Sequence, residues 1–350
     1  MSDLEKPLST KARILRELTS PRSDDGFVSG QELAEKCKVS RTAVWKAVQT
    51  LMRQGMEIEA VTNKGYHLKG CGNSLNRENI EVLLSPGIAG RICVYKTIDS
   101  TNTEAKRWCA EKSPAAVHKS VIVAEQQTAG RGRMGRAFYS PAESGLYLSI
   151  LYSPCGGVRQ PAKMTAGAAV AVCRSLDRLY GITTRIKWVN DIFYNGRKVC
   201  GILTEGISSL ESGIVETAIV GIGVNISNGT GGFPAEIAAV AGSVLGNGTS
   251  SVSRNQLAAS IIEEALKIYD AETDGRKEAV DKVMQEYKER SMIIGKTVEV
   301  CPLAGSTADS YKAAVLDIGD DASLIVQDEK GCRRELQSGE ITLHSDNFLS

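Results

Sequence analysis

The first 70 residues carry three short stretches in which apolar side chains recur every three or four positions, the spacing of one face of a helix. The first stretch covers 11–18, the second begins at Ser29, and the third follows Ser40. Serine is favoured at the start of a helix because its hydroxyl accepts a hydrogen bond from a backbone N–H group that has no partner within the helix. Two of the three predicted helices therefore begin at identifiable caps.

A hairpin pattern follows these helices. Residues 56–61 alternate between apolar and polar, 62–65 form a predicted turn, and 66–68 return as a second strand. Three helices and a hairpin make up a winged helix-turn-helix domain, which we predict for residues 1–70. Both periodicities stop at 69–76, so we place the linker to the next domain there.

The third predicted helix has two contrasting faces, with apolar residues inward and polar ones outward. Candidate DNA-contacting residues are Ser40, Arg41, Thr42, Trp45, Lys46 and Gln49. From Lys36 to Arg53 there are five cations (Lys36, Lys38, Arg41, Lys46 and Arg53) and no acid, although the formal net charge of the chain is only +1. Local positive charge of this kind suits contacts with phosphate groups. The pattern also fits a small helical interaction domain with a solvated basic face.

Strand-like and helical patterns alternate between residues 77 and 290. The predicted strands cover 92–95, 121–124, 146–151, 185–188, 201–204 and 217–224. The predicted helices cover 101–112, 162–180, 256–269 and 276–287. This alternation predicts an α/β or α+β domain built on one sheet, without giving the strand order.

Shorter alternating runs occupy residues 291–350. They cover 297–301, 311–317, 323–326 and 333–337. Turns rich in glycine and aspartate separate them, so we predict a small β-barrel.

Composition narrows the kind of protein. The nine cysteines form no C-x-x-C pair and only three histidines accompany them, so we predict neither a zinc site nor a disulfide framework. Scattered thiols are typical of the reducing cytoplasm. The N-terminus has no apolar core of the kind found in signal peptides. The chain also has no apolar run of roughly 18 residues, the length that indicates a membrane helix. We therefore expect a cytoplasmic protein without membrane contact.

Glycine and arginine alternate at 130–136, directly after the predicted strand 121–124. Glycine allows the backbone to approach a ligand closely, and guanidinium groups offer forked donors for carboxylate and phosphate oxygens. No P-loop sequence is present. The loop is therefore a candidate anion site of another kind.

The flanking motifs give this loop a more specific meaning. They are Asp-Ser-Thr-Asn at 99–102, Glu-Gln-Gln-Thr-Ala at 125–129, Lys-Trp-Val-Asn-Asp at 187–191 and Arg-Lys-Val-Cys-Gly-Ile-Leu at 197–203. In this order and spacing they resemble the biotin protein ligases. Together with the N-terminal region, the chain resembles the bifunctional ligases that also act as biotin operon repressors.

The resemblance implies a multidomain α+β fold. The winged helix-turn-helix domain at 1–70 would precede a catalytic domain at 77–290, related to class II aminoacyl-tRNA synthetases and lipoate ligases. That domain would have a mixed, mainly antiparallel sheet with helices on one side. An SH3-like barrel would follow at 291–350, with 338–341 resembling its final motif.

The resemblance also implies roles for individual residues. The biotin site would consist of Ser100, Thr101, Asn102, Gln127, Arg131, Gly132, Arg133 and Lys198. The nucleotide site would consist of Arg131, Arg136, Phe138, Asn190, Asp191 and Asn225. Lys198 would contact the biotin carboxyl and the α-phosphate as the main catalytic cation, supported by Arg133 and Lys187. The family commonly has proline where Val189 stands, so we expect an effect on affinity rather than on activity.

The implied reaction uses ATP, with Mg²⁺, to convert biotin into biotinyl-5'-AMP, whose acyl group passes to a lysine of a biotin carboxyl carrier protein. The adenylate would also act as corepressor for a homodimer bound to operator DNA of biotin genes. Three alternatives stay open: a biotin-sensing repressor with little ligase activity, a ligase with a vestigial DNA-binding domain, and a ligase for lipoate or another acid.

Overall fold

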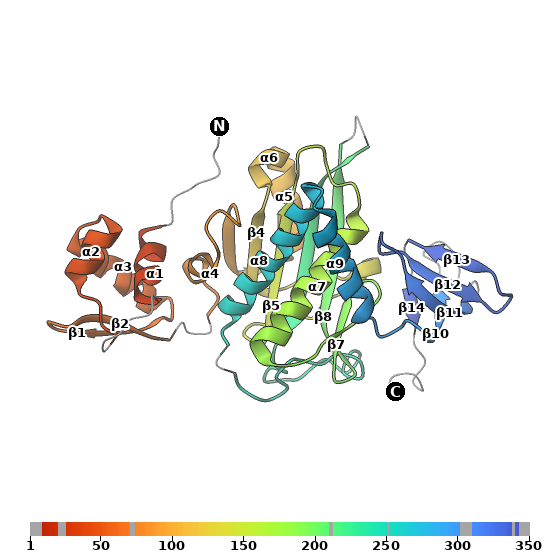
Figure 1. Ribbon diagram of the computed structural model, residues 1–350. Helices are drawn as coiled ribbons and strands as arrows, with labels where there is room; N and C mark the ends of the chain where they lie inside the picture. Colours follow the sequence, from red (N-terminus) through yellow and green to blue (C-terminus); the bar gives the residue numbers. More distant parts are fainter. Residues whose placement is uncertain are drawn as a thin grey trace.

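The computed structural model describes residues 9–19, 26–70, 74–209, 213–250, 252–301, 310–337 and 340–342. The elements form three groups along the chain: a small helical group with a hairpin, a large central sheet with helices, and a C-terminal sheet (Figure 1). No helix within the described ranges is long and apolar enough to cross a membrane.

The N-terminal group has the predicted winged helix-turn-helix architecture. Its elements are α1 (Thr10–Thr19), α2 (Gly30–Cys37), α3 (Arg41–Arg53), β1 (Glu57–Val61) and β2 (Gly65–Gly70). Ser29 and Ser40 are the predicted caps, and their hydroxyls accept from the backbone N–H groups of Glu32 at 3.0 Å and Ala43 at 3.2 Å. β1 and β2 pair antiparallel as the wing.

A separate hydrophobic core holds this domain together. It contains the buried residues Leu15, Leu33, Val44, Val48 and Leu51. The last three belong to α3, and their burial confirms the predicted inner face of this helix. Residues 1–8 of the predicted domain lie outside the described part of the chain.

The central domain is built on one seven-stranded sheet with the order β3-β4-β5-β9-β8-β7-β6. Its strands are β3 (Ile92–Ile98), β4 (Ser120–Gln127), β5 (Gly145–Tyr152), β6 (Arg185–Lys187), β7 (Asp191–Tyr194), β8 (Arg197–Ser208) and β9 (Val215–Asn225). Only β3 and β4 pair in parallel, and all the other neighbours are antiparallel. The mixed, mainly antiparallel sheet is thus confirmed.

The helices that accompany this sheet include two that the pattern analysis did not predict, α4 and α6. They are α4 (Arg77–Leu83), α5 (Thr101–Glu111), α6 (Pro114–Val117), α7 (Pro161–Tyr180), α8 (Arg254–Thr273) and α9 (Lys277–Glu289). A single 3-10 turn, Arg133–Gly135, lies within the glycine and arginine loop.

The expectation of helices on one side of the sheet is wrong. Val121 and Val123 of β4 join the main core with α7 and α8, whereas Ile122 between them packs against α5 in a second cluster. Adjacent residues of a strand point to opposite faces, so α5 covers the face opposite α7 and α8. Strand β5 is buried at every position, which requires cover on both faces.

Helix α4 connects the N-terminal domain to the central one. The side chain of Asn255 in α8 accepts from the backbone N–H of Asn76 at 2.9 Å and donates to the carbonyl of Ser74 at 3.0 Å. Glu78 of α4 forms an ion pair with Lys11 of α1. Part of the predicted linker, 71–73, lies outside the described residues.

The C-terminal group is a five-stranded antiparallel sheet with the order β13-β12-β11-β10-β14. Its strands are β10 (Thr297–Cys301), β11 (Tyr311–Ile318), β12 (Leu324–Asp328), β13 (Arg333–Leu336) and β14 (Glu340–Thr342). The buried indole of Trp188 donates to the carbonyl of Ala322 at 2.8 Å and so ties this sheet to the central domain. Closure into an SH3-like barrel and the exact domain limits stay predictions. Ser338 and Gly339 lie outside the described residues.

Candidate functional site

One cavity of about 380 Å³ collects every residue predicted for catalysis, biotin and nucleotide. These residues are Ser100, Thr101, Asn102, Gln127, Arg131, Gly132, Arg133, Arg136, Phe138, Lys187, Asn190, Asp191, Lys198 and Asn225. They come from the start of α5, the end of β4, the loop after it, and strands β6 to β9. The fold thus brings together positions that lie up to 125 residues apart (100 to 225) in the chain.

The glycine and arginine loop folds back on itself beside this cavity. The N–H of Phe138 donates to the carbonyl of Gly130 at 2.9 Å, and the N–H of Gly132 donates to the carbonyl of Arg136 at 2.7 Å. A Cβ atom at Gly130 would lie 2.4 Å from the carbonyl oxygen of Phe138, so only glycine fits there. Gly135 has a φ of +74°, which also favours glycine.

Polar side chains at the start of α5 are fixed by neighbouring strands. Gln127 Oε1 accepts from the backbone N–H of Thr101 at 2.8 Å, while Gln127 Nε2 donates to the hydroxyl of Ser140 at 2.9 Å. Asn102 Nδ2 donates to the carbonyl of Leu203 at 3.2 Å. Ser100, Thr101 and Asn102 are all buried, so their polar groups are held in fixed positions.

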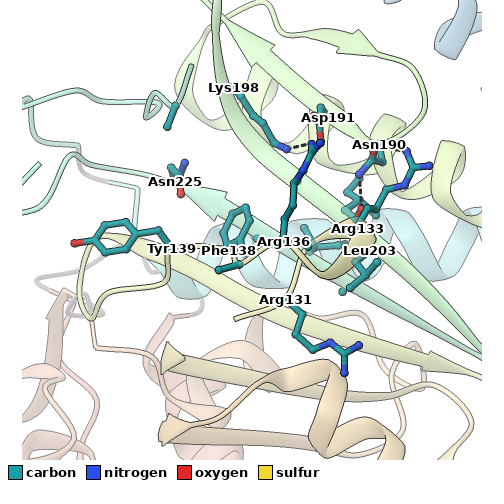
Figure 2. A pocket seen from close by; sticks show the side chains of 18 of the residues that line it. Arg131, Arg133, Arg136, Phe138, Tyr139, Asn190, Asp191, Lys198, Leu203 and Asn225 are labelled. Carbon is teal, nitrogen blue, oxygen red and sulfur yellow. Dashed lines mark hydrogen bonds and ion pairs between the residues drawn. The ribbon is translucent and has the colours of Figure 1, made fainter. Parts of the chain in front are cut away.

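Cations gather at another part of the cavity. Lys198 Nζ lies 2.6 Å from Asp191 Oδ1, and Arg133 Nη1 donates to Asn190 Oδ1 at 3.1 Å. Asn190 in turn donates to the carbonyl of Ile202 at 2.8 Å. Figure 2 shows these four residues with Arg136 on one side of the cavity.

Arg131 differs from its expected place. Its guanidinium lies 3.4 Å from the carboxylate of Glu205, and Figure 2 shows the side chain pointing away from the group around Lys198. Burial opposes ionisation of Glu205, but hydrogen bonds from Lys106 and Asn102 and the charges of Lys106 and Arg131 outweigh it and lower the pKa of this carboxyl. In this structure, Arg131 therefore pairs with a stable carboxylate rather than facing the other cations.

Phe138 forms an aromatic wall of the cavity. Its ring lies edge-on to Tyr147 with 6.4 Å between centroids, and a Cβ atom at Gly223 would come within 2.4 Å of it. The absence of a side chain at Gly223 makes room for this ring.

Part of the cavity wall was not predicted from the sequence. Phe233, Glu236, Ile237, Val240 and Ala241 line it, although their segment has no helical or strand periodicity. The segment is tied to β8, because the N–H of Lys198 donates to the carbonyl of Val240 at 2.9 Å. Asn225 Nδ2 donates to the carbonyl of Gly242 at 3.1 Å.

The charges of the cavity favour anionic ligands. Its lining includes the cations Arg131, Arg133, Arg136, Lys187 and Lys198 and the acids Asp191 and Glu236. An excess of positive charge beside an apolar slot suits a molecule with an uncharged body and a carboxylate or phosphate end. No group of three or more metal-ligating side chains occurs in the described part of the chain, where the cysteines are free.

The predicted DNA-contacting residues lie on or next to one exposed face of α3. Arg41, Thr42 and Lys46 are exposed, Trp45 is 54% exposed, and Gln49 is half-buried. Ser40 is also exposed, but its hydroxyl caps the helix. A hollow between α3, the start of α2 and the wing is lined partly by Asn63 and Lys64, which the prediction missed.

One member of the predicted cationic strip does not belong to it. Lys36 forms ion pairs with Glu17 at 3.0 Å and Glu32 at 3.1 Å. Glu17 lies far outside the acid-free window and reaches Lys36 only through the packing of α1 against α2. The charge of Lys36 is therefore neutralised locally.

Comparisons with known proteins agree with this organisation. Residues 94–225 match the biotin/lipoate A/B protein ligase family, and residues 13–67 match an HTH domain. The solved biotin protein ligase from Aquifex aeolicus in complex with biotin and ATP has a similar fold, with a TM-score of 0.57, 23% identity and coverage of 73% of this chain and 98% of that chain.

Two curated relatives extend over nearly the whole chain. The bifunctional ligase/repressor BirA of Bacillus spizizenii is 31% identical over 96% of this chain and 99% of its own length. The protein of the same name from Bacillus subtilis is 30% identical over the same shares. The chain therefore belongs to the biotin protein ligase family, and its combination of a ligase domain with a helix-turn-helix domain is that of the bifunctional ligase/repressors.

Proposed function

We propose that the central cavity converts biotin and ATP into biotinyl-5'-AMP and pyrophosphate. A biotin carboxylate oxygen would attack the α-phosphorus, and the bond to the β-phosphate oxygen would break. A lysine ε-amine of a carrier protein would then attack the acyl carbon, form the amide and release AMP. The single observation that carries this proposal is the convergence of all predicted ligand residues on one cavity.

The cavity cations have a clear task in this reaction. Carboxylate and triphosphate repel each other, and charge on the phosphoryl oxygens must be stabilised at the transition state by groups already in position. Lys198 would contact both reacting groups, and Arg133 and Lys187 would support it. Asn190 already holds Arg133.

Roles can also be proposed for the remaining lining residues. The biotin ring would lie near Ser100, Thr101, Asn102 and Gln127, and Phe138 would cover the adenine. Arg131 and Arg136 would hold phosphate once the loop closes, which would require Arg131 to exchange Glu205 for the ligand. Loop closure would also keep water away from the adenylate.

Mg²⁺ would accompany ATP. This ion usually binds through one or two protein carboxylates together with substrate phosphates, so a small donor set is sufficient. Asp191 and Glu236 are the carboxylates in the cavity lining, and they fit that requirement. The ion would supply positive charge to the phosphate groups.

The acceptor partner would be a biotin carboxyl carrier protein. Incubation of the full chain with ATP, biotin and a carrier domain tests this directly. We expect biotin attached to the carrier lysine, detected as a mass increase. An unmodified carrier, under conditions in which a related ligase modifies it, would remove the enzyme proposal.

The second activity would be repression of biotin genes. The exposed face of α3 and the wing would contact operator DNA, and a homodimer formed through the central sheet would match a palindromic operator. Adenylate would favour the dimer. Salt-sensitive, sequence-selective binding that strengthens with biotin and ATP is expected; binding without sequence preference would argue for a vestigial domain.

A lipoate-type specificity is the remaining alternative from another substrate class. The same cations would serve any carboxylic acid, so the ring-binding end must decide. Comparison of biotin and lipoic acid in ATP–pyrophosphate exchange separates the two. We expect exchange with biotin alone.

A further inference from the structure

Ser149 lies behind the ring-binding end of the cavity. It occupies the middle of β5, is fully buried, and is not part of the cavity lining. Its hydroxyl oxygen lies 2.7 Å from Thr101 Oγ1 and 2.6 Å from Asn102 Oδ1. One buried hydroxyl therefore contacts two residues that do line the cavity.

The orientation of the Asn102 amide follows from its other contacts. Nδ2 donates to the carboxylate of Glu205 at 2.9 Å and to the carbonyl of Leu203 at 3.2 Å, and both partners only accept. The ion pair of Glu205 with Lys106 at 2.7 Å keeps that carboxylate charged. Asn102 Oδ1 must therefore face Ser149, in the space that the missing side chain of Gly221 leaves.

The protons of this cluster can now be assigned. Asn102 Oδ1 has no proton, so the single hydroxyl proton of Ser149 lies in its bond to Asn102. The 2.7 Å contact between Ser149 and Thr101 then needs the hydroxyl proton of Thr101. Gln127 Oε1 is a weaker competitor for that proton, because it lies 3.2 Å away and already accepts from the Thr101 backbone.

We propose that Ser149 is a positioning residue that makes Thr101 a hydrogen-bond acceptor toward the cavity. The proposal rests on the proposed ligase function, because the matching donor is an N–H group of the biotin ureido ring. A ligand without a donor at this point would leave a buried acceptor unpaired, which is costly. Ser149 thus selects the substrate without touching it.

The test compares Ser149→Ala with the full-length wild-type chain in ATP–pyrophosphate exchange. Because one net hydrogen bond is at stake, we expect the KM for biotin to rise about 10-fold while kcat changes less than about 2-fold. Dethiobiotin keeps the ureido group and lacks the sulfur, so its KM is expected to rise by the same factor. The KM for ATP should stay unchanged.

Ser153→Ala is the matched control. Ser153 directly follows β5, four residues after Ser149, and is also buried. It shares a 2.7 Å hydrogen bond with Thr217, and neither residue lines the cavity. We expect this variant to lose stability like Ser149→Ala but to keep the wild-type KM for biotin. Equal KM values in the two variants would overturn the proposal.

A further variant covers the case in which Ser149→Ala does not fold. Ser149→Cys keeps a weaker donor of similar size, and a raised KM for biotin with unchanged kcat supports the proposal, whereas a wild-type KM overturns it. Failure of the wild type to exchange with biotin would instead refute the proposed function itself.

Discussion

Lys198 Nζ and Asp191 Oδ1 lie 2.6 Å apart across the neighbouring strands β8 and β7. The carboxylate of Asp191 holds the amine of Lys198 in the cavity (Figure 2). There the same amine can also contact an anionic ligand. The ion pair also prevents an isolated cation from facing a half-buried site. This contact joins two motifs that the sequence separates, at 187–191 and 197–203.

Removal of the Lys198 amine is expected to impair adenylation severely. We predict that Lys198→Ala lowers kcat for adenylate formation about 10²-fold to 10³-fold, the usual effect of losing one preorganised donor to a developing charge. Rapid-quench detection of biotinyl-5'-AMP measures it. Lys119→Ala, which breaks a comparable 2.7 Å pair with Asp270 away from the cavity lining, should retain wild-type kcat.

Trp188 is expected to stabilise the junction with the C-terminal sheet. Trp188→Phe would leave the carbonyl of Ala322 without its buried donor, and we predict a loss of about 1–3 kcal/mol in the free energy of unfolding. Urea titration measures this loss. Trp108→Phe is the control. The indole of Trp108 donates to Glu104 at 3.0 Å, but Glu104 also accepts from Tyr95 and Arg107, so the loss of stability should be smaller. Equal losses would show that the indole bond adds nothing.

The stability of the turn that contains Ala322 is expected to depend on pH through Asp321. Hydrogen bonds from Gln337 and Ser323 lower the pKa of Asp321 from 3.8 to about 2. Because the folded pKa is lowered, the stability contribution is complete above pH 3.8 and is lost as the pH falls through about 2. Carboxyl NMR titration should give a midpoint near 2 in the wild type and a higher one in Gln337→Ala. A wild-type midpoint at 3.8 would contradict the assignment.

Two lysines of the N-terminal domain, Lys46 and Lys36, are expected to contribute differently to DNA binding. Lys46 is exposed on α3, and within the described ranges no carboxylate pairs with it, whereas Lys36 is held by Glu17 and Glu32. We predict that Lys46→Ala reduces the salt dependence of operator binding by about 0.9 in log–log slope, the loss of one phosphate contact. Lys36→Ala should leave the slope unchanged. The reverse order would place the DNA on another face.

The residues that line the cavity could be predicted from the sequence, but the residues that hold them in position could not. Motifs around Gln127 and Lys198 were recognisable because each is a short run of consecutive residues. Ser149 and Glu205 were not predicted. Both contact Asn102, but Ser149 lies 47 residues from it in the chain and Glu205 lies 103 residues from it. A local sequence pattern does not reveal such long-range contacts.

The arrangement of helices is a different case. Residues 145–152 form an almost continuous apolar run, which is typical of a strand covered on both faces. That signal argued against helices on one side only. The segment 233–241 had no comparable signal, because its place in the cavity wall depends on backbone bonds to β8.

In the proposed first reaction, this cavity joins biotin to the α-phosphate of ATP. Biotin-dependent ATP–pyrophosphate exchange by the full chain isolates this step, because the exchange requires only the first reaction and neither carrier nor DNA. We predict exchange of labelled pyrophosphate into ATP when biotin is present and none when biotin is omitted. The absence of exchange with biotin, in a parallel assay in which a related ligase is active, would contradict the claim.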